Sequence, residues 1–268
     1  MIVDVNVTLS RWPFRHLAGD DPAGLVARLR KRDVVQAWAG SFDGILHKDM
    51  AGVNSRLARD CRNYGAGMLV PFGTVNPKLP DWQDDLRRCQ EEHKMPGIRL
   101  YPNYHGYDLK DPLFRELLAA AAKRGFIVQI AARMEDERTQ HPFLRVPNVD
   151  LGPLADALAS EPRARVVVLN WSPGPRPGAA QKLTGAGEVY FDFSSLEGTG
   201  GLGRFIQQIP PQRVLFGSNF PLFYFESAFL KVQESGLTEE QRAAVLAQNA
   251  RKLVPAGAAP ARPRPAGS

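Results

Sequence analysis

Residues 97–132 read GIRLYPNYHGYDLKDPLFRELLAAAAKRGFIVQIAA and contain one complete unit of the architecture that this sequence predicts. A short apolar run ends at Tyr101, and a loop leads to Asp111-Pro112, a residue pair typical of a helix N-cap and first helical position. The helix is predicted to stop at Gly125, and a second apolar run, FIVQIAA, follows it. The stretch therefore predicts a strand, a helix and a second strand parallel to the first.

The same unit recurs along the rest of the chain. Further apolar runs precede helix signals, namely IVDVNV, VVQAWA, GMLVPFGTV, ARVVVLN, VYFDFSS and RVLFGS. The runs are continuous instead of alternating, which is typical of strands covered on both faces. Together they make eight strand-then-helix units, of which the sixth has only a weak helical signal. Eight parallel units in about 250 residues predict a single (β/α)₈ TIM barrel over residues 1–254. A doubly wound sheet would use the same units, but the first strand is not followed by the Gly-rich phosphate-binding fingerprint of that fold.

Composition indicates a soluble globular protein, because 44% of the 268 residues are hydrophobic and 23% are charged. No apolar run approaches the roughly 18 residues of a membrane helix, and MIVDVNVTLS does not resemble a signal peptide. The two cysteines favour a reduced, cytoplasmic protein. The net charge is 34 − 28 = +6, but the basic residues are spread along helices, so we expect neither nucleic acid nor membrane as a partner. Residues 255–268 are Pro/Ala-rich and are predicted to be a disordered tail.

Reactive groups of such a barrel lie at the C-terminal ends of the strands and in the loops that follow. The densest polar segment, residues 133–141, follows the fifth strand. In one interpretation Asp136 orients His141 as a general base, and Arg138 holds a substrate carboxylate through two hydrogen bonds. In the other, the segment is a set of local ion pairs that closes the barrel mouth.

The other strand ends carry further candidates. His105, beside Tyr104 on the loop after the fourth strand, is either an acid or base or the cap of a turn. Glu197 is either an acid at the mouth or a carboxylate at a helix N-terminus. Arg99 is either an anchor for an anionic substrate or the partner of a buried aspartate, because an unpaired buried arginine is costly.

Several segments resemble the amidohydrolase superfamily, in its branch with the amidohydrolase-related (type 2) domain. These segments are IVDVNVTLSRWPFR, GIRLYPNYHGYDLKDP, VQIAARMEDERTQHP, VYFDFSSLEG, and FGSNFPLFYFESAFLK followed by NARKL. They resemble the first, fourth, fifth, seventh and eighth strands of that family with their loops, so the resemblance spans residues 2–253. It implies a (β/α)₈ barrel and a homodimer.

The resemblance also implies where a catalytic metal would be bound. The family's two first-strand histidines correspond to Asn6 and Thr8, its later histidines to Ala131 and Asn170, and its eighth-strand aspartate to Asn219. Zinc favours His, Cys and carboxylate ligands over neutral amide and hydroxyl oxygens, so we expect no catalytic metal and no cofactor. The three asparagines could form a ring that binds a polar ligand or an oxyanion, or they could bond only to each other.

We therefore predict a metal-independent hydrolase or lyase that acts on a small carboxylate-bearing molecule, such as a lactone or an amide. The superfamily's pyrone-dicarboxylate lactonases resemble this plan and work without metal. The predicted acids and bases are His141, His105, Asp136 and Glu197, and the predicted substrate contacts are Arg99, Arg138, Asn6, Asn170, Asn219 and Tyr104. One alternative is a non-catalytic pseudoenzyme that binds a small ligand or a partner subunit. Another is a displaced metal site built from Asp136, His141 and Glu197.

Overall fold

The computed structural model describes residues 1–173 and 178–255 of the chain. Its strands are β1 (Ile2–Leu9), β2 (Val34–Ser41), β3 (Leu69–Pro71), β4 (Gly73–Thr74), β5 (Gly97–Leu100), β6 (Ile127–Ala131), β7 (Arg165–Leu169), β8 (Glu188–Asp192) and β9 (Val214–Leu215). They pair in parallel in the order of the sequence, β1-β2-β3 and β4-β5-β6-β7-β8-β9. The predicted disordered tail lies outside the described residues, apart from Pro255.

Two junctions turn these sheets into a closed barrel. Only Phe72 separates β3 from β4, and its N–H donates to the carbonyl oxygen of Ala39 in β2 at 2.8 Å, so the two short segments act as one strand. At the other edge the chain after β9 pairs with β1, where Thr8 N–H donates to Phe220 O at 3.0 Å. The predicted eight-stranded parallel barrel is therefore confirmed.

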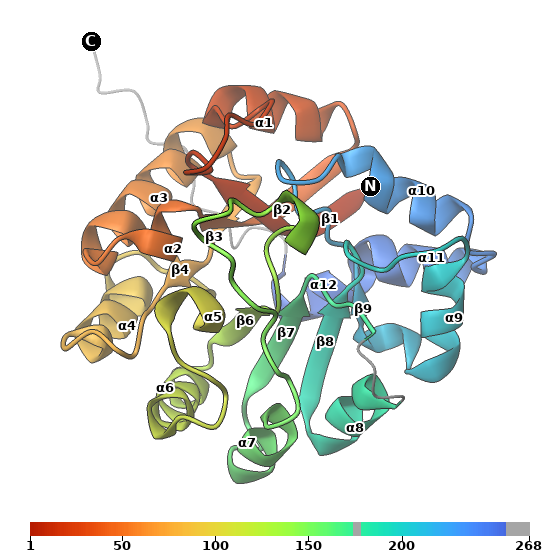
Figure 1. Cartoon of the computed structure of the whole chain (residues 1–268). Helices are drawn as coiled ribbons and strands as arrows, with labels where there is room; N and C mark the ends of the chain where they lie inside the picture. The colour runs from red at the N-terminus through yellow and green to blue at the C-terminus, as the bar shows by residue number, and fades with distance from the viewer. Residues whose placement is uncertain (174–177, 256–268) are drawn as a thin grey trace.

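Helices surround the barrel (Figure 1). They are α1 (Pro22–Arg30), α2 (Asp43–Leu46), α3 (Met50–Gly65), α4 (Trp82–Glu91), α5 (Pro102–His105), α6 (Pro112–Lys123), α7 (Leu154–Ser160), α8 (Ala179–Ala186), α9 (Gly201–Gln208), α10 (Phe225–Gln233), α11 (Glu239–Ala243) and α12 (Asn249–Leu253). The side chain of Asp111 caps α6 by accepting from Leu113 N–H, as the Asp-Pro pair predicts. The expectation of little helix in the sixth unit is corrected by the structure. There α8 forms and buries Ala180 and Leu183.

The barrel interior is filled in layers. Its lower part is an apolar cluster of strand side chains, including Val5, Trp38 and Phe72, against which α12 packs. The C-terminal mouth is covered by a second apolar group, here called the mouth cluster, which consists of Trp12, Leu17, Phe42, Ile45, Tyr101, Ala131 and Met134. In the view of Figure 1 the segment between β6 and α7 passes in front of the strands. Polar chemistry is thereby confined to a thin layer between the two clusters and to the loops around the mouth.

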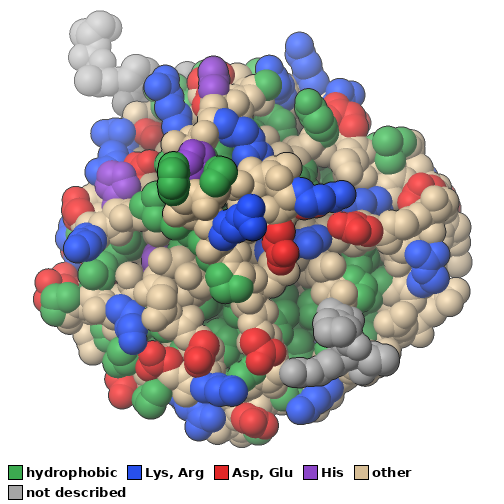
Figure 2. Space-filling model, viewed as in Figure 1, with side chains coloured by type: hydrophobic (Ala, Val, Ile, Leu, Met, Phe, Trp, Pro, Cys, Tyr) green, Lys and Arg blue, Asp and Glu red, His purple; other side chains and the backbone are tan. Residues whose placement is uncertain are grey.

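The outer surface carries charges of both signs. Lys and Arg side chains are mixed with Asp and Glu over the face seen in Figure 2, including the area around the strand ends. Within the described part of the chain, no helix is both long and apolar enough to cross a membrane.

Candidate ligand-binding site

A closed hydrogen-bonded group, here called the axial network, lies beneath the mouth cluster and consists of Asn6, Asn170, Asp192 and Ser194. The Nδ2 of Asn6 donates to Asn170 Oδ1 at 2.7 Å and to Asp192 Oδ2 at 2.8 Å. Ser194 Oγ lies 2.8 Å from both Asn170 Oδ1 and Asp192 Oδ1. All four residues are buried, and burial raises the pKa of Asp192. The network thus satisfies one buried carboxylate with neutral donors supplied by the protein itself.

Two asparagine side chains fix the segment that follows β6. Asn170 Nδ2 donates to the carbonyl oxygen of Arg133, and Asn219 Nδ2 donates to that of Met134 at 3.0 Å. Both asparagines have a φ of 56°, the left-handed conformation that Asn tolerates better than most residues. These bonds hold the backbone of residues 133–134 over the strand ends and place Met134 in the mouth cluster.

The predicted ring of three asparagines is therefore correct only for two of them. Asn6 and Asn170 bond to each other directly. The side-chain amide of Asn219 instead donates to the backbone carbonyl oxygen of Met134. The Oδ1 of Asn219 is buried without a partner among the described residues.

Arg99 lies inside the barrel and not in an open mouth. Its guanidinium donates to Gln129 Oε1 at 2.7 Å, to Val7 O and Thr8 Oγ1 at 3.0 Å each, and to Trp38 O at 3.1 Å. The residue is 1% exposed, and burial lowers the pKa of Arg99. The predicted role as a substrate anchor is corrected here: this guanidinium ties strands together, and its donors are already used.

The predicted pair of Asp136 and His141 is not assembled. The carboxylate of Asp136 accepts from Nε and Nη2 of Arg138 at 2.9 and 2.6 Å, and these bonds lower the pKa of Asp136. The ring of His141 stacks on Phe14 at a centroid distance of 6.0 Å and packs at a tilt against Phe143 at 5.6 Å. The structure thus matches the alternative interpretation of this segment, a local ion pair, and leaves Arg138 exposed on the rim.

Tyr104 and His105 both lie on α5, and His105 contacts α2. The Nε2 of His105 lies 2.8 Å from the carbonyl oxygen of Gly44, so this nitrogen must carry the proton and donate it. Burial lowers the pKa of His105, and its Nδ1 is buried without a partner among the described residues. Tyr104 packs against the mouth cluster, and burial raises the pKa of Tyr104. Both residues therefore serve packing in this arrangement.

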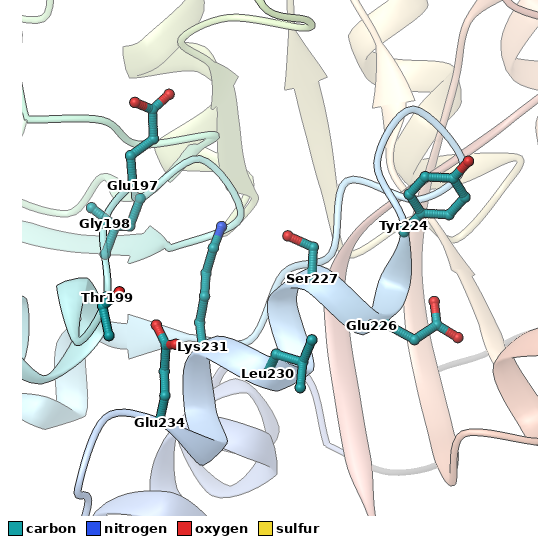
Figure 3. Close-up of a pocket in the computed structure, with 10 residues that line it drawn as sticks. Glu197, Gly198, Thr199, Tyr224, Glu226, Ser227, Leu230, Lys231 and Glu234 are labelled. Atoms are coloured by element: carbon teal, nitrogen blue, oxygen red, sulfur yellow. The ribbon is translucent and has the colours of Figure 1, made fainter.

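Glu197 borders a shallow groove beside the mouth. The groove has a volume of about 790 Å³ and lies between the loop after β8 and α10 (Figure 3). Figure 3 shows Lys231 rising from α10 toward that loop, with the carboxylate of Glu197 directed away from it. Lys231 Nζ donates to the carbonyl oxygen of Ser194, which belongs to the axial network, and burial lowers the pKa of Lys231. Glu197 itself is 77% exposed.

A second pocket, here called the side pocket, opens next to Asn170 and has a volume of about 510 Å³. It lies between the chain after β6, the chain after β7 and the start of α8. Its lining includes Ala132, Arg133, Asn148, Val149, Asp150, Leu151, Gly152, Asn170, Trp171, Ser172, Pro173, Gly178, Ala179, Lys182 and Leu183. The volume falls in the range of pockets that hold small molecules.

Arg133 and Lys182 are the two cationic side chains among the described residues that line this pocket, and Arg133 is the more buried of the two. Its Nη2 donates to the carbonyl oxygen of Ser195 at 3.0 Å and lies 4.0 Å from the exposed Glu197. Its side chain is 17% exposed, and its Nε is fully buried and has no partner among the described residues. The sequence offered a signal for it: Arg133 is two residues beyond Ala131, so it continues the face of β6 that points inward.

The residues at the strand ends do not fit a metal of the type the resemblance implies. Asn6, Thr8, Ala131, Asn170 and Asn219 supply neither imidazole nor carboxylate. Within residues 1–173 and 178–255, no three His, Cys, Asp or Glu side chains are grouped so that they could hold a metal ion. The displaced site of Asp136, His141 and Glu197 is therefore not formed.

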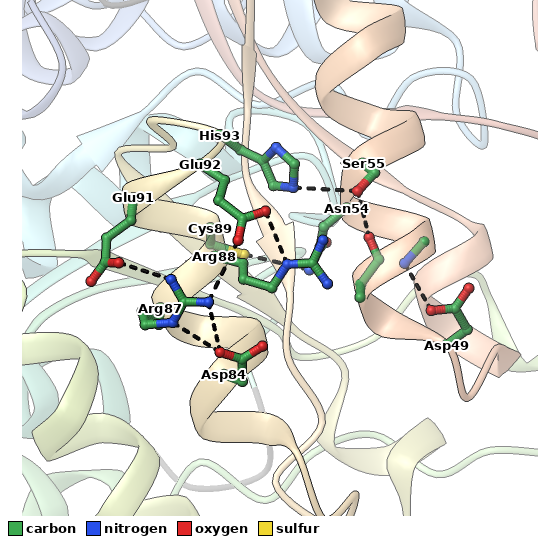
Figure 4. Close-up of polar contacts among 12 residues, drawn as sticks. Asp49, Asn54, Ser55, Asp84, Arg87, Arg88, Cys89, Glu91, Glu92 and His93 are labelled. Carbon is green, nitrogen blue, oxygen red and sulfur yellow. Dashed lines mark hydrogen bonds and ion pairs between the residues drawn. The ribbon is translucent and has the colours of Figure 1, made fainter.

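A polar cluster on α3 and α4 lies outside the mouth and serves packing (Figure 4). Arg87 bonds to Asp84 and Glu91 on its own helix at 2.8 and 2.9 Å. Beneath them Asn54 Nδ2 donates to the sulfur of the buried Cys89 at 3.4 Å, and burial raises the pKa of Cys89. A buried thiol of this kind is inert as a nucleophile.

Comparison with known proteins gives a family and a fold. The family model described as Amidohydrolase matches residues 8–256. The 2,6-dihydroxybenzoate decarboxylase from Rhizobium has a TM-score of 0.69 at 14% identity, with 94% of this chain and 98% of that chain covered. A dihydroxybenzoic acid decarboxylase from Polaromonas with bound manganese and 2-nitroresorcinol has a TM-score of 0.70 at 12% identity, covering 94% and 96%. The 4-oxalomesaconate hydratase from Rhodopseudomonas palustris has a TM-score of 0.65 at 14% identity, covering 95% and 96%. No curated protein sequence matches the chain.

Proposed function

This chain belongs to the amidohydrolase family, whose model spans residues 8–256, and we propose that it binds a small carboxylate-bearing molecule in the side pocket without the family's metal. The observation that carries the proposal is Arg133, a largely buried cation that lines that pocket and whose guanidinium has one backbone acceptor at hydrogen-bond distance among the described residues. The decarboxylases and the hydratase of similar fold bear the names of small carboxylates, which supports the ligand class.

The chemistry of arginine makes a carboxylate the fitting ligand. A guanidinium presents parallel N–H donors that match the two oxygens of a carboxylate. Burying a charged donor without an acceptor is unfavourable, and Arg133 has one backbone acceptor at hydrogen-bond distance among the described residues. A ligand carboxylate in the side pocket would be a further acceptor for the guanidinium, whose side chain is 17% exposed. The backbone of Arg133 is already fixed by Asn170, so little order is lost on binding.

The donor set at the strand ends supports binding without a metal. Asn6 donates its side-chain amide to Asn170 and Asp192, and Asn170 donates its own to the carbonyl oxygen of Arg133, so these neutral amides are engaged within the protein. The family's way of activating water requires a metal cation, because a bound metal lowers the pKa of its water. We derive no reaction step through a metal in this chain.

The arrangement favours ligand binding over turnover. None of the predicted acids and bases, His141, His105, Asp136 and Glu197, lines the side pocket. Catalysis by a general acid or base requires the group within hydrogen-bond reach of the substrate. We therefore propose the non-catalytic alternative, a pseudoenzyme that binds a small carboxylate. The hydrolase or lyase activity stays a prediction that product analysis can test.

Titration calorimetry on the full chain tests the proposal. Benzoate and 2,6-dihydroxybenzoate are titrated into protein treated with EDTA, and then into protein supplied with manganese or zinc. We expect binding that is independent of metal and that weakens about tenfold to a hundredfold in Arg133→Gln, since charged hydrogen bonds contribute about 1.5–3 kcal/mol. The matched control Arg138→Gln, on the same segment, should bind as the unaltered protein does.

Two results would overturn the proposal. One is equal affinity of the Arg133→Gln variant and the unaltered protein; the other is binding that appears only with metal. Mass spectrometry of the same mixtures after prolonged incubation distinguishes binding from turnover. Formation of a decarboxylated or hydrolysed product that depends on protein concentration would establish an enzyme.

A further inference from the structure

The groove between the loop after β8 and α10 contains a partly buried lysine (Figure 3). Lys231 extends from α10 toward that loop, and its Nζ donates to the carbonyl oxygen of Ser194. Among the described residues, no carboxylate lies within salt-bridge distance of this amine. The groove and the side pocket share no lining residue, so this lysine belongs to a separate site.

The single backbone acceptor orients the amine of Lys231 and leaves its nitrogen free to react. An uncharged lysine amine has two N–H bonds and one lone pair, so one N–H can stay on Ser194 O while the lone pair attacks a carbon atom. Burial lowers the pKa of Lys231, which increases the uncharged fraction at neutral pH. Arg133 adds to this lowering, and nearby carboxylates oppose it without reversing it. These carboxylates are those of Asp192, Glu197 and Glu234.

The lining of the groove favours an uncharged reaction partner. Tyr224 and Leu230, which are 79% and 57% exposed, provide apolar surface beside the amine. Three carboxylates also line the groove, those of Glu197, Glu226 and Glu234. Lys231 is the single cationic side chain among the described lining residues. Anionic reagents, such as acyl phosphates and keto acids, are therefore repelled, whereas an uncharged molecule with an apolar body is not.

We propose that Lys231 forms an imine with an uncharged aldehyde that binds in this groove. The nitrogen lone pair adds to the carbonyl carbon, and one N–H proton passes to the carbonyl oxygen, which gives a carbinolamine. The second N–H proton then leaves with the hydroxyl group as water, and the C=N double bond forms. A protonated imine keeps one N–H, which can donate to Ser194 O as the lysine does now.

Reductive trapping on the full chain tests the proposal. Benzaldehyde is added at pH 7 with sodium cyanoborohydride, which converts an imine into a stable secondary amine, and peptide mass spectrometry reports the modification of each lysine. We expect Lys231 to react on the order of tenfold faster than Lys123, an exposed lysine of α6 outside the groove. The rate at Lys231 should saturate with benzaldehyde concentration. At pH 9.5 the preference should shrink, because ordinary lysines lose their protons near a pKa of about 10.4.

An anionic aldehyde tests the role of the carboxylates. 4-Formylbenzoate is benzaldehyde with a carboxylate on the far side of the ring. Measured relative to Lys123 in the same sample, its reaction at Lys231 at low salt should be about threefold to tenfold slower than that of benzaldehyde. This difference should shrink in 0.5 M NaCl, because salt screens exposed charges.

A matched pair of variants separates the amine from its charge. Lys231→Arg keeps a cationic donor for Ser194 O, but a guanidinium stays protonated and forms no imine under these conditions. This variant should unfold at the same temperature as the unaltered protein and lose the rapid incorporation of benzaldehyde. The control Lys123→Arg should keep that incorporation.

Three results would overturn the proposal. The first is equal rates at Lys231 and Lys123, a comparison within one protein that needs no variant to fold. The second is a rate at Lys231 that rises in proportion to benzaldehyde concentration without saturation. The third is rapid incorporation that persists in Lys231→Arg. None of these results bears on the carboxylate site, because the two sites share no lining residue.

Discussion

Two arginines at the ends of neighbouring strands show how the barrel axis differs from the side pocket. Arg99 of β5 has four acceptors within 3.1 Å, contributed by β1, β2 and β6. Arg133, just beyond β6, has a single backbone acceptor at 3.0 Å and an unpartnered Nε. Both side chains are largely buried, so the two arginines differ in the number of hydrogen-bond acceptors that the protein places around them. At the axis the protein supplies four acceptors, whereas at the side pocket it supplies one among the described residues.

The largest expected effect comes from removing the two arginines in turn. Arg99→Met should lower the free energy of unfolding by about 3–5 kcal/mol, because it strands buried acceptors that the guanidinium now satisfies. Arg133→Met should cost about 1 kcal/mol or less, since few protein contacts are lost. Urea unfolding followed by circular dichroism measures both. Equal losses of unfolding free energy in the two variants would show that Arg133 is bound by the protein as firmly as Arg99.

The interior of the barrel and the rim of its mouth should respond to pH with opposite sign. Burial raises the pKa of Asp4, beneath the mouth, to about 7, even though Ser218 donates to it. A carboxyl group with a raised folded-state pKa gives its full stability below the unfolded value of about 3.9, and this is lost as pH rises toward 7. Asp136 on the rim has a lowered pKa, so its contribution is present above that unfolded value and is lost at lower pH.

Unfolding curves between pH 3 and pH 8 test this contrast. Relative to the unaltered protein, Asp4→Asn should gain stability as pH rises from 4 to 7, by at most about 4 kcal/mol. Asp136→Asn should lose relative stability as pH rises from 3 to 5, by a much smaller amount because solvent screens this ion pair at the rim. A difference between Asp4→Asn and the unaltered protein that stays constant across this range would contradict the raised pKa.

A glycine pair measures how tightly the axis is packed. A Cβ at Gly40 of β2 would lie 2.7 Å from Nη1 and 2.8 Å from Cδ of Arg99. Gly40→Ala should therefore cost about 1–3 kcal/mol in unfolding free energy. In contrast, a Cβ at Gly185 of α8 meets nothing within 4 Å. Gly185→Ala should stabilise the helix by about 0.5–1 kcal/mol, and thermal unfolding of both variants gives the answer.

The smallest effect is expected on the rim. Arg138 is 86% exposed and pairs only with Asp136 among the described residues. Exposed ion pairs contribute little because solvent and salt screen them. Thermal unfolding of Arg138→Gln should therefore match that of the unaltered protein within experimental error. A clear loss would mean that this segment holds the mouth closed more firmly than its exposure indicates.

Local signals were enough to predict the succession of elements and the closed parallel barrel. The Asp111-Pro112 pair begins α6 as expected, since capping and proline geometry act over a few neighbouring residues. The continuous apolar runs likewise indicate strands buried on both faces, because each residue of such a run has an apolar side chain whichever face it points to. The exception is α8, where a Gly/Pro-rich stretch hid a helix that is stabilised by burying Ala180 and Leu183.

What the polar side chains at the strand ends do was decided only by the tertiary structure. The sequence identified Arg99, Arg138 and the asparagines as candidates, but Arg133 became the available cation once the chain had closed. Asn170 reaches the carbonyl of a residue 37 positions earlier, and Arg99 reaches Thr8, 91 positions earlier. Closing the barrel creates such contacts between strands distant in sequence, so neither spacing nor composition contains them. The sequence alone determined which polar residue types stand at the strand ends, and the tertiary structure determined which hydrogen-bond partners each of them has.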